Sequence, residues 1–485
     1  MVKVVIVNKI IPRVLYNSGY MIRTRIAPSP TGYPHIGTIY QVLFDYVYAK
    51  QHNGKFIMRL EDTDRARFVP GSEDVIYKSL EWFGLNPDES PKIGGPYKPY
   101  RQSERLPIYQ KYIQELISKK HAYYCFCTKE RLDEMRKEQQ AKKISPMYDK
   151  KCLHLSEEEV KKNLENKITH VVRMNVPENE TITINDMIVG KVNFESNTID
   201  HQVILKSDGF PTYHLAVVVD DHLMEITHIF RGREWLPSTP KHVLLYRYFG
   251  WKIPEHGHLP LILNSDGKGK LSKRFSHASV DYYREQGYLP EAILNYLANL
   301  VWFHEGGVEI YSLDEFIKLF DIKKIGSQGA RFDLQKLDWV NGIYIRNMKQ
   351  ETLNEKIMDF YKDKNLPKDI VLKTIPLIQE RIKKLSDYLP LCEFFFKAPE
   401  KYEVDLANKK DFFKQVHQEL EKVTDWKTGL IGESLINLAK KLEIKNSQFF
   451  ADLRMVITGK KISPPLNESM ELLGKEECLN RLTIK

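Results

Sequence analysis

A strand, a turn, a helix and a second strand follow one another between Met21 and Asp64, and this succession limits the possible folds most strongly. The segment MIRTRIAPSP alternates in polarity before its prolines, which predicts a strand that ends in a turn. A helix is expected over IYQVLFDYVYAKQHNG, closed at Asn53-Gly54, and a second strand over KFIMRLEDTD. A strand–helix–strand unit favours a parallel sheet, so we expect an α/β fold.

Polar residues follow both predicted strands. His35, within SPTGYPHIGT, comes after the first strand, and the run EDTD at Glu61–Asp64 ends the second. Ligands of parallel sheets bind beyond the carboxyl ends of the strands, and a turn entering a helix directs backbone N–H groups at phosphate. We therefore expect His35 to hydrogen-bond phosphate oxygens and Gly37 to allow close approach of a base or backbone. The alternative is a solvated histidine in a proline-stiffened loop.

Length and composition restrict the class of protein. A chain of 485 residues exceeds one core, so two to four domains are expected. The net charge of +9 fits a polyanionic partner such as nucleic acid, or equally a lysine-rich surface without one. No apolar run approaches the ~20 residues of a membrane-spanning helix. Five cysteines in a chain of this length argue against a disulfide framework and for a reducing compartment.

The first twenty residues differ from the rest. They are basic and lack acidic residues, and their apolar run VVIV is too short for a signal peptide. Serine is scarce for a transit peptide. We expect residues 1–20 to be a dispensable extension or the product of an early start codon, because a self-sufficient strand pattern begins at Met21.

The α/β pattern is interrupted and later resumes. Between Ala122 and about Ile204 it is replaced by cysteines, charged helical pieces and short strands such as THVVRMNV. It returns in VILKSDGFPTYHLAVVVDDHLMEITHIFRG, where Asp208-Gly209 predicts a turn and LAVVVDD a buried strand. After about Ile345 the chain is mostly helical. We expect a nucleotide-binding fold that is split by an insertion and followed by a helical region.

A cationic loop, DGKGKLSKRFSH, occupies residues 266–277. It contains Lys268, Lys270, Lys273 and Arg274 among two glycines and two serines. Such a loop is suited to close over a triphosphate and to neutralise a departing pyrophosphate. The alternative is a solvated basic loop.

Together, HIGT and KLSKR resemble the HIGH and KMSKS signatures of class I aminoacyl-tRNA synthetases, with Thr38, Leu271 and Arg274 as departures. The segments TRIAPSPTGYPHIGT, RLEDTDRARFVPGSE, GGPYKPYRQSERLPIY and FDLQKLDWVNGIYIR resemble the bacterial-type glutamyl-tRNA synthetases, as does LRMVITGKKISPPLNESMELLGKEE near the end. The resemblance covers roughly residues 21 to 485. Glutaminyl-tRNA synthetases share the catalytic fold but carry a different pattern after the second strand.

The resemblance implies an α/β fold: a split Rossmann-like nucleotide-binding catalytic domain with an inserted α+β domain, followed by an all-α C-terminal anticodon-binding region. The implied boundaries are an extension at 1–20, catalytic halves at 21–105 and 206–262, an acceptor-end-binding insertion with a zinc site at 106–205, a stem-contact region with the KLSKR loop at 263–345, and a helical anticodon-binding domain at 346–485.

The implied activity is that of a glutamate–tRNA ligase. Such an enzyme activates L-glutamate with ATP to glutamyl-adenylate and pyrophosphate, then transfers glutamate to the 3′ end of tRNA(Glu). Mg²⁺ is expected with ATP, and family members generally need bound tRNA before they activate glutamate. The implied catalytic residues are His35, Gly37, Lys270, Ser272 and Lys273. The residues implied to bind ATP are His35, Gly37, Trp235 and Lys273. The residues implied to bind glutamate are Arg25, Ala27, Ser29, Glu61, Tyr213 and Arg231.

Within the implied glutamate site, Arg25 would hold the side-chain carboxylate, since a guanidinium matches a carboxylate better than a neutral amide. Glu61 would take the ammonium. The alternative for these two residues is a mutual ion pair. In some family members an asparagine stands where Val217 stands here.

Three cysteines and a histidine form the pattern C-x-C-x24-C-x-H at Cys125, Cys127, Cys152 and His154. Thiolates with one imidazole make a closed, structural zinc set, and we expect one zinc per chain. Tyr148 is the substitute ligand if His154 faces away. The alternative is three buried thiols. Some glutamyl-tRNA synthetases carry such a site and others do not. The remaining cysteines, Cys392 and Cys478, are expected in the core.

Other functions remain open from the sequence. A nucleotidyltransferase acting on a small molecule would not need the helical tail, and a non-catalytic RNA-binding module would not need the intact signatures. A shortened relative that glutamylates a modified tRNA base lacks the anticodon domain. For tRNA, Arg381 is our candidate anticodon contact. The sequence leaves open whether tRNA(Gln) is also charged. We expect a cytoplasmic monomer.

Overall fold

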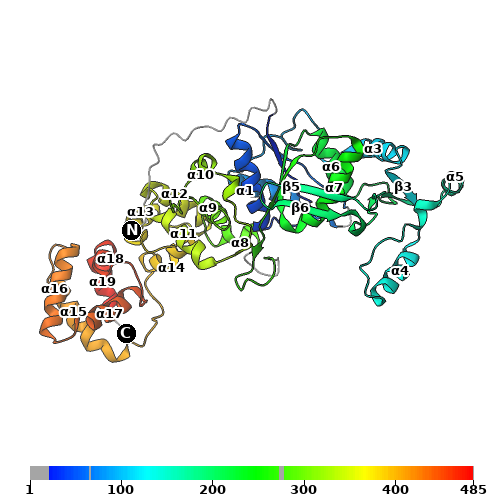
Figure 1. The fold of residues 1–485 in the computed structure, drawn as a ribbon. Helices are drawn as coiled ribbons and strands as arrows, with labels where there is room; N and C mark the ends of the chain where they lie inside the picture. The colour runs from blue at the N-terminus through cyan, green and yellow to red at the C-terminus, as the bar shows by residue number, and fades with distance from the viewer. Residues whose placement is uncertain (1–20, 65–66, 272–277, 484–485) are drawn as a thin grey trace. The chain divides into compact units, whose positions relative to one another are not determined.

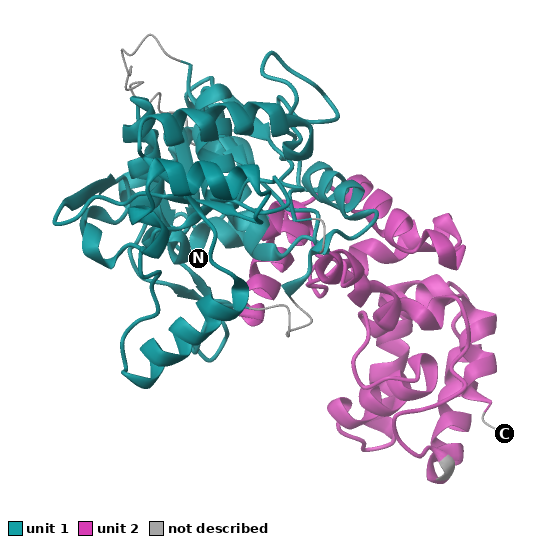
Figure 2. Ribbon diagram, turned by 90° about the vertical axis from the view of Figure 1, so that its right-hand side faces the viewer, with its two compact units in different colours: residues 1–280, 294–332 teal, residues 281–293, 333–485 magenta. Residues whose placement is uncertain are grey.

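The computed structural model describes residues 21–64, 67–271 and 278–483, apart from the side chain of Asn408. Its chain divides into two compact units, formed by residues 1–280 with 294–332 and by 281–293 with 333–485 (Figure 2). No helix within the described residues combines the length and the apolar character needed to cross a membrane.

The first unit is a mixed α/β structure (Figure 1). Its elements are β1 (Arg23–Ile26), α1 (Ile36–Gln51), β2 (Lys55–Met58), α2 (Ser72–Trp82), α3 (Leu106–Ser118), β3 (Ala122–Cys125), α4 (Lys129–Ala141), α5 (Glu157–Glu165), β4 (Val171–Met174), β5 (Thr181–Asp186), β6 (Gly190–Glu195), β7 (Val203–Leu205), α6 (Tyr213–Leu223), β8 (His228–Gly232), α7 (Thr239–Phe249), β9 (Glu255–Leu259), β10 (Ile262–Leu263), α10 (Leu313–Leu319) and β11 (Ala330–Arg331).

The parallel unit expected at the start of the chain is confirmed. β1 pairs with β2 in parallel, with Arg25 opposite Ile57, and α1 packs against both strands. On its other side β1 contacts β8, which pairs in parallel with β9. From the contact between β1 and β8, the next strand in sequence therefore lies on opposite sides: β2 beside β1, and β9 beside β8. Such a switch in strand order opens a crevice at the carboxyl ends of the strands, where α/β proteins bind ligands.

The segment between β3 and β7 contributes to two sheets. β3, β4 and β7 form an antiparallel sheet of their own. The β5–β6 hairpin instead joins β9 and β8, in a sheet of order β6-β5-β9-β8. The short strand predicted within THVVRMNV is confirmed as β4.

One predicted strand is wrong. LAVVVDD belongs to helix α6, and Leu215 to Val219 are all buried there. Its side chains pack into the core with α3 and α7. A short run of β-branched residues with apolar neighbours on every side has no periodicity, so it cannot be distinguished from a fully buried helix.

The second unit is helical. Most of it consists of α11 (Leu334–Arg346), α12 (Gln350–Phe360), α13 (Lys368–Ile378), α14 (Tyr388–Cys392), α15 (Lys410–Glu421), α16 (Thr428–Lys441), α17 (Asn446–Thr458), α18 (Leu466–Leu473) and α19 (Lys475–Leu482). Helices α8 (Val280–Glu285) and α9 (Pro290–Asn299) lie at the boundaries between the units. Cys392 and Cys478 are fully buried, as expected for core residues.

Candidate functional site

The two signature segments meet in one cleft of about 460 Å³ in the first unit. This volume lies within the range of about 300–1,000 Å³ that is usual for small-molecule sites. The lining residues are His35, Gly37, Thr38, Tyr40, Gln41, Gly232, Glu234, Trp235, Pro260, Leu261, Ile262, Lys270 and Leu271. They come from the start of α1 and from the segments that follow β8 and β9, so the cleft lies at the carboxyl ends of the strands.

His35 begins helix α1, and its imidazole has a structural part in doing so. Its Nδ1 accepts a hydrogen bond of 2.9 Å from the backbone N–H of Gly37, which caps the helix. A Cβ atom on residue 37 would lie only 3.0 Å from this nitrogen. Gly37 therefore leaves room for the capping imidazole. Because it has no side chain, it also leaves space in the cleft that it lines.

A tight hairpin presents Lys270 to the cleft. Gly267 and Gly269 have φ angles of 74° and 77°, and the chain then returns so that the Leu271 N–H bonds to the Ile262 carbonyl at 2.9 Å. The Lys270 ammonium pairs with Glu234, a cleft residue that the sequence did not single out. In the sequence, Glu234 could have been found only because it directly precedes Trp235, a residue expected to bind ATP. Ser272 and Lys273 lie outside the described residues.

The mutual ion pair considered as the alternative for Arg25 and Glu61 does not form. Arg25 Nη2 lies 3.1 Å from Asp221 Oδ2, whereas Glu61 Oε1 lies 3.1 Å from Arg59 Nη2. Arg59 also bonds to Asp221, at 2.6 Å. Burial raises the pKa of Glu61 to about 7, against the opposing effect of Arg59 and Arg25.

Asp220, the neighbour of Asp221 on α6, extends this network. Its carboxylate accepts hydrogen bonds from Arg105 Nε at 2.7 Å, the Tyr109 hydroxyl at 2.8 Å and Gln102 Nε2 at 2.9 Å. All of these groups are buried. Sequence reasoning missed the two aspartates because it treated their segment as an apolar strand.

Arg231, near the end of β8, differs from these arginines because its partners are neutral. Its guanidinium donates to three neutral acceptors: Thr239 Oγ1 at 2.7 Å, His258 Nε2 at 3.1 Å and His242 Nδ1 at 3.3 Å. Within the described part of the chain, no carboxylate forms an ion pair with it. Burial lowers the pKa of Arg231. A ligand carboxylate would therefore not have to displace a protein carboxylate that contacts Arg231 directly.

Tyr213 connects the buried charges to the cleft. Its ring lies 4.9 Å from the Trp235 ring, centroid to centroid. Burial raises the pKa of Tyr213, and the nearby Arg231 and Arg25 oppose that shift. Ala27 and Ser29 follow β1 directly, but neither lines the cleft, and Ser29 is exposed. Val217 is 2% exposed in the core that α6 shares with α7.

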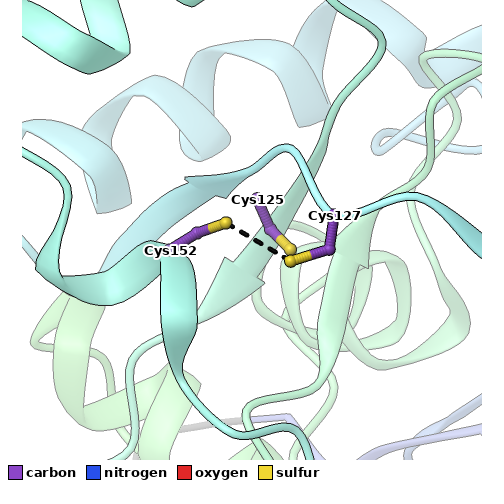
Figure 3. Close-up of side chains that lie close together, drawn as sticks. All are labelled: Cys125, Cys127 and Cys152. Atoms are coloured by element: carbon purple, nitrogen blue, oxygen red, sulfur yellow. Dashed lines mark hydrogen bonds between the residues drawn. The ribbon is translucent and has the colours of Figure 1, made fainter. Parts of the chain in front are cut away.

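The three cysteines converge in the inserted segment (Figure 3). Their sulfur atoms all lie within 4.8 Å of one another, and Cys127 Sγ is 3.5 Å from Cys152 Sγ. The Tyr148 hydroxyl lies 3.4 Å from Cys125 Sγ and 3.3 Å from Cys127 Sγ. A hydrogen bond from Cys152 lowers the pKa of Cys125.

These spacings fit a tetrahedral zinc ion. Ligands at the usual zinc distances place two sulfurs about 3.8 Å apart and a sulfur and an oxygen about 3.6 Å apart. His154 is exposed and lies outside the group that the sulfurs form. The physical reason is local: residues 151–154 form a 3-10 turn, in which a side chain two positions after Cys152 points away from it.

Arg381 belongs to the second unit. It is exposed in the turn that follows α13, and its N–H bonds to the Ile378 carbonyl at 2.8 Å. Its charge contributes, after burial, to lowering the pKa of Arg454. The two arginines therefore lie near each other in this unit.

Comparison with known proteins gives consistent matches. Residues 21–339 match the family described as tRNA synthetases class I (E and Q), catalytic domain, and residues 346–484 match an anticodon binding domain. Glutamate–tRNA ligase of Acinetobacter baumannii (strain SDF) is 45% identical over 95% of this chain and 92% of its own length. That of Dehalococcoides mccartyi (strain CBDB1) is 42% identical over 96% of both. A crystal structure of a glutamate tRNA ligase from Elizabethkingia meningosepticum, in complex with its amino acid, superposes with a TM-score of 0.87 at 40% identity, covering 96% of this chain and 98% of that one.

Proposed function

The chain belongs to the class I tRNA synthetases (E and Q), and we propose that it is a glutamate–tRNA ligase. It activates L-glutamate with ATP and transfers the glutamyl group to the 3′ end of tRNA(Glu). The proposal rests on the family, on the cleft that unites both signature segments, and on the charges beside it.

The pairing of the buried arginines is the observation that carries the choice of amino acid. Arg25, Arg59 and Arg105 each have a carboxylate in direct contact, from Glu61, Asp220 or Asp221. Arg231 has none among the described residues and donates only to neutral acceptors. The side-chain carboxylate of glutamate can contact such a guanidinium directly. The neutral side-chain amide of glutamine matches a guanidinium less well.

In the first step, a carboxylate oxygen of glutamate attacks the α-phosphorus of ATP, and the bond to the pyrophosphate oxygen breaks. Arg25 and Arg231 orient the carboxylates, and Glu61 receives the ammonium. His35 and the start of α1 hold phosphate oxygens, and Trp235 borders the nucleotide. Lys270 and Lys273 stabilise the charge that builds up on the departing pyrophosphate. Mg²⁺ accompanies ATP.

In the second step, a terminal ribose hydroxyl of tRNA attacks the carbonyl carbon of the mixed anhydride, and AMP leaves. The inserted segment receives the acceptor end, and the helical unit, with Arg381, receives the anticodon. We further propose that the protein acts as a monomer in the cytoplasm.

The assay that tests this function charges purified tRNA(Glu) and tRNA(Gln) in turn with labelled glutamate or glutamine. We expect glutamyl-tRNA(Glu), formed only with ATP, and no glutaminyl product. Charging of tRNA(Gln) with glutamate would identify an enzyme that serves both tRNAs. A protein that shows no tRNA-dependent glutamate activation would refute the proposal.

We also propose one structural zinc per chain, held by Cys125, Cys127, Cys152 and the Tyr148 oxygen. Elemental analysis should find about one zinc per chain. Loss of an outer-shell partner weakens metal affinity by about 10- to 100-fold, and loss of a direct ligand should cost at least as much. Tyr148→Phe should therefore release zinc to a chelator sooner than the wild type. His154→Ala, the matched control, should retain it. A folded protein without zinc, or the reverse order of the two variants, would contradict this assignment.

A further inference from the structure

Arg231 is held differently from the other buried arginines of the site. Arg25 and Arg59 both bond to the carboxylate of Asp221, and Arg105 to that of Asp220. Arg231 instead donates to two imidazoles and a hydroxyl, none of which carries a negative charge. A buried guanidinium without a nearby carboxylate is costly, which indicates that something else compensates for it.

The compensating group lies behind His258. Strands β8 and β9 pair in parallel with Arg231 opposite His258, so the two side chains are neighbours on one face of the sheet. His258 Nε2 accepts from Arg231 Nε at 3.1 Å, and His258 Nδ1 lies 2.5 Å from Asp186 Oδ2. Asp186, His258 and Arg231 form a continuous buried chain of carboxylate, imidazole and guanidinium.

The hydrogen bonds fix the direction of this chain. Asp186 Oδ1 accepts from the backbone N–H groups of Ile188 at 3.0 Å and Val189 at 2.9 Å, and both its oxygens lie 3.2 Å from the His258 backbone nitrogen. A carboxylate surrounded by donors stays ionised and can only accept. His258 therefore carries its proton on Nδ1, and the lone pair of Nε2 faces Arg231.

We propose that Asp186 and His258 are positioning residues that hold the Arg231 guanidinium for a carboxylate of the amino-acid substrate. The inference rests on the proposed function. The imidazole of His258 fixes Arg231 through a hydrogen bond from Nε. The negative charge of Asp186 stabilises the guanidinium through the imidazole, without contacting it. A carboxylate in direct contact would stabilise Arg231 equally well, but it would compete with the substrate for the same N–H groups.

This assignment gives the β5–β6 hairpin a part in amino-acid binding. Asp186 is the last residue of β5, and it pairs in register with His256 of β9. The hairpin lies between β4 and β7 along the chain, within the segment that interrupts the catalytic fold. Its attachment to β9 therefore brings a carboxylate from the insertion to the back of the substrate site.

The test is tRNA-dependent ATP–pyrophosphate exchange by the full chain. Asp186→Asn removes the charge and presents an amide N–H toward the His258 Nδ1 proton, which disfavours the ring tautomer that accepts from Arg231. Misplacing a substrate-binding group in this way costs about 10- to 100-fold, so we expect the KM for glutamate to rise by that factor. The KM for ATP should stay within about threefold of the wild-type value, because the misplaced group binds the amino acid.

A second pair of variants keeps the test independent of how Asp186→Asn folds. His258→Gln can place a carbonyl oxygen near the Nε2 position, whereas His258→Asn is too short to reach Arg231. We expect glutamine to preserve the KM for glutamate better than asparagine does. His256→Gln is the matched control: this histidine is equally buried on β9, its Nε2 has no hydrogen bond within the described structure, and its replacement should spare the KM for glutamate.

The outcomes separate the two proposals. If the wild type does not activate glutamate, the proposed function is wrong. If it does, and Asp186→Asn folds with an unchanged KM for glutamate, the positioning role is wrong. Equal effects of His258→Gln, His258→Asn and His256→Gln would show that the histidines only fill space, which also overturns the inference.

Discussion

The proposed amino-acid end and the proposed nucleotide end of the site differ in burial and in charge pairing. At the amino-acid end, Arg25 and Arg231 are each 3% exposed and Glu61 is 7% exposed, and every charge has fixed partners. At the nucleotide end, Trp235 is 39% exposed, and Lys270 is held by an ion pair to Glu234 at the protein surface. The two ends meet where the Tyr213 and Trp235 rings touch.

The difference follows from the two chemical tasks. Discriminating a carboxylate from an amide of the same shape needs charges that cannot relax toward the wrong ligand, and burial in a network provides this. Stabilising a departing pyrophosphate needs a cation that can exchange partners. An exposed ion pair such as Lys270–Glu234 is worth only about 0–1 kcal/mol, so phosphate can displace it easily.

The largest expected effect is at the amino-acid end. Arg231→Met removes the guanidinium while keeping an unbranched side chain. Hydrogen bonds to charged groups contribute about 1.5–3 kcal/mol each, so the KM for glutamate should rise by about 10²–10³-fold in ATP–pyrophosphate exchange. Arg231→Lys keeps the charge without the planar fork and should be intermediate. A KM within threefold of the wild-type value would show that Arg231 does not bind the substrate.

A change at the nucleotide end should alter rate and not affinity for the amino acid. Lys270→Ala should lower kcat by about 10²-fold, since it removes a preorganised charge from the transition state. The KM for glutamate and the thermal midpoint should change little. Glu234→Gln breaks the same ion pair but keeps the lysine, and it should cost far less activity. Equal losses in both variants would mean that the pair, and not the lysine, supports catalysis.

The smallest effect concerns pH. The pKa of Glu61 is raised to about 7 by burial, so below pH 7 this carboxyl is increasingly protonated and loses its attraction for the ammonium of glutamate. The KM for glutamate should rise by up to about tenfold per pH unit below 7. Because the folded state binds this proton more tightly than the unfolded chain, the contribution of Glu61 to stability falls as pH rises toward 7. Glu61→Gln should remove this component of the pH dependence, and a flat profile in the wild type would contradict the assignment.

The sequence predicted the α/β elements before the insertion more accurately than those after it. The alternation in MIRTRIAPSP and the glycine after Asn53 are local signals, and they correctly indicated β1, α1 and β2. LAVVVDD carried no periodicity, so helix α6 was taken for a strand, and with it the roles of Asp220 and Asp221 were lost. Similarly, the spacing of Cys152 and His154 suits an extended chain, whereas the 3-10 turn at residues 151–154 directs the two side chains apart.

Residue types and local spacing indicated an imidazole at a helix start, a lysine-bearing loop and a set of thiols as candidate groups, and the family resemblance added the arginines. The pairing of those groups was decided in three dimensions. Arg25 and Asp221 are 196 positions apart. Asp186 reaches His258, the partner of Arg231, only because β5 pairs with β9. Ionic interactions depend on distance and burial, and both are set by packing between segments that no local pattern relates.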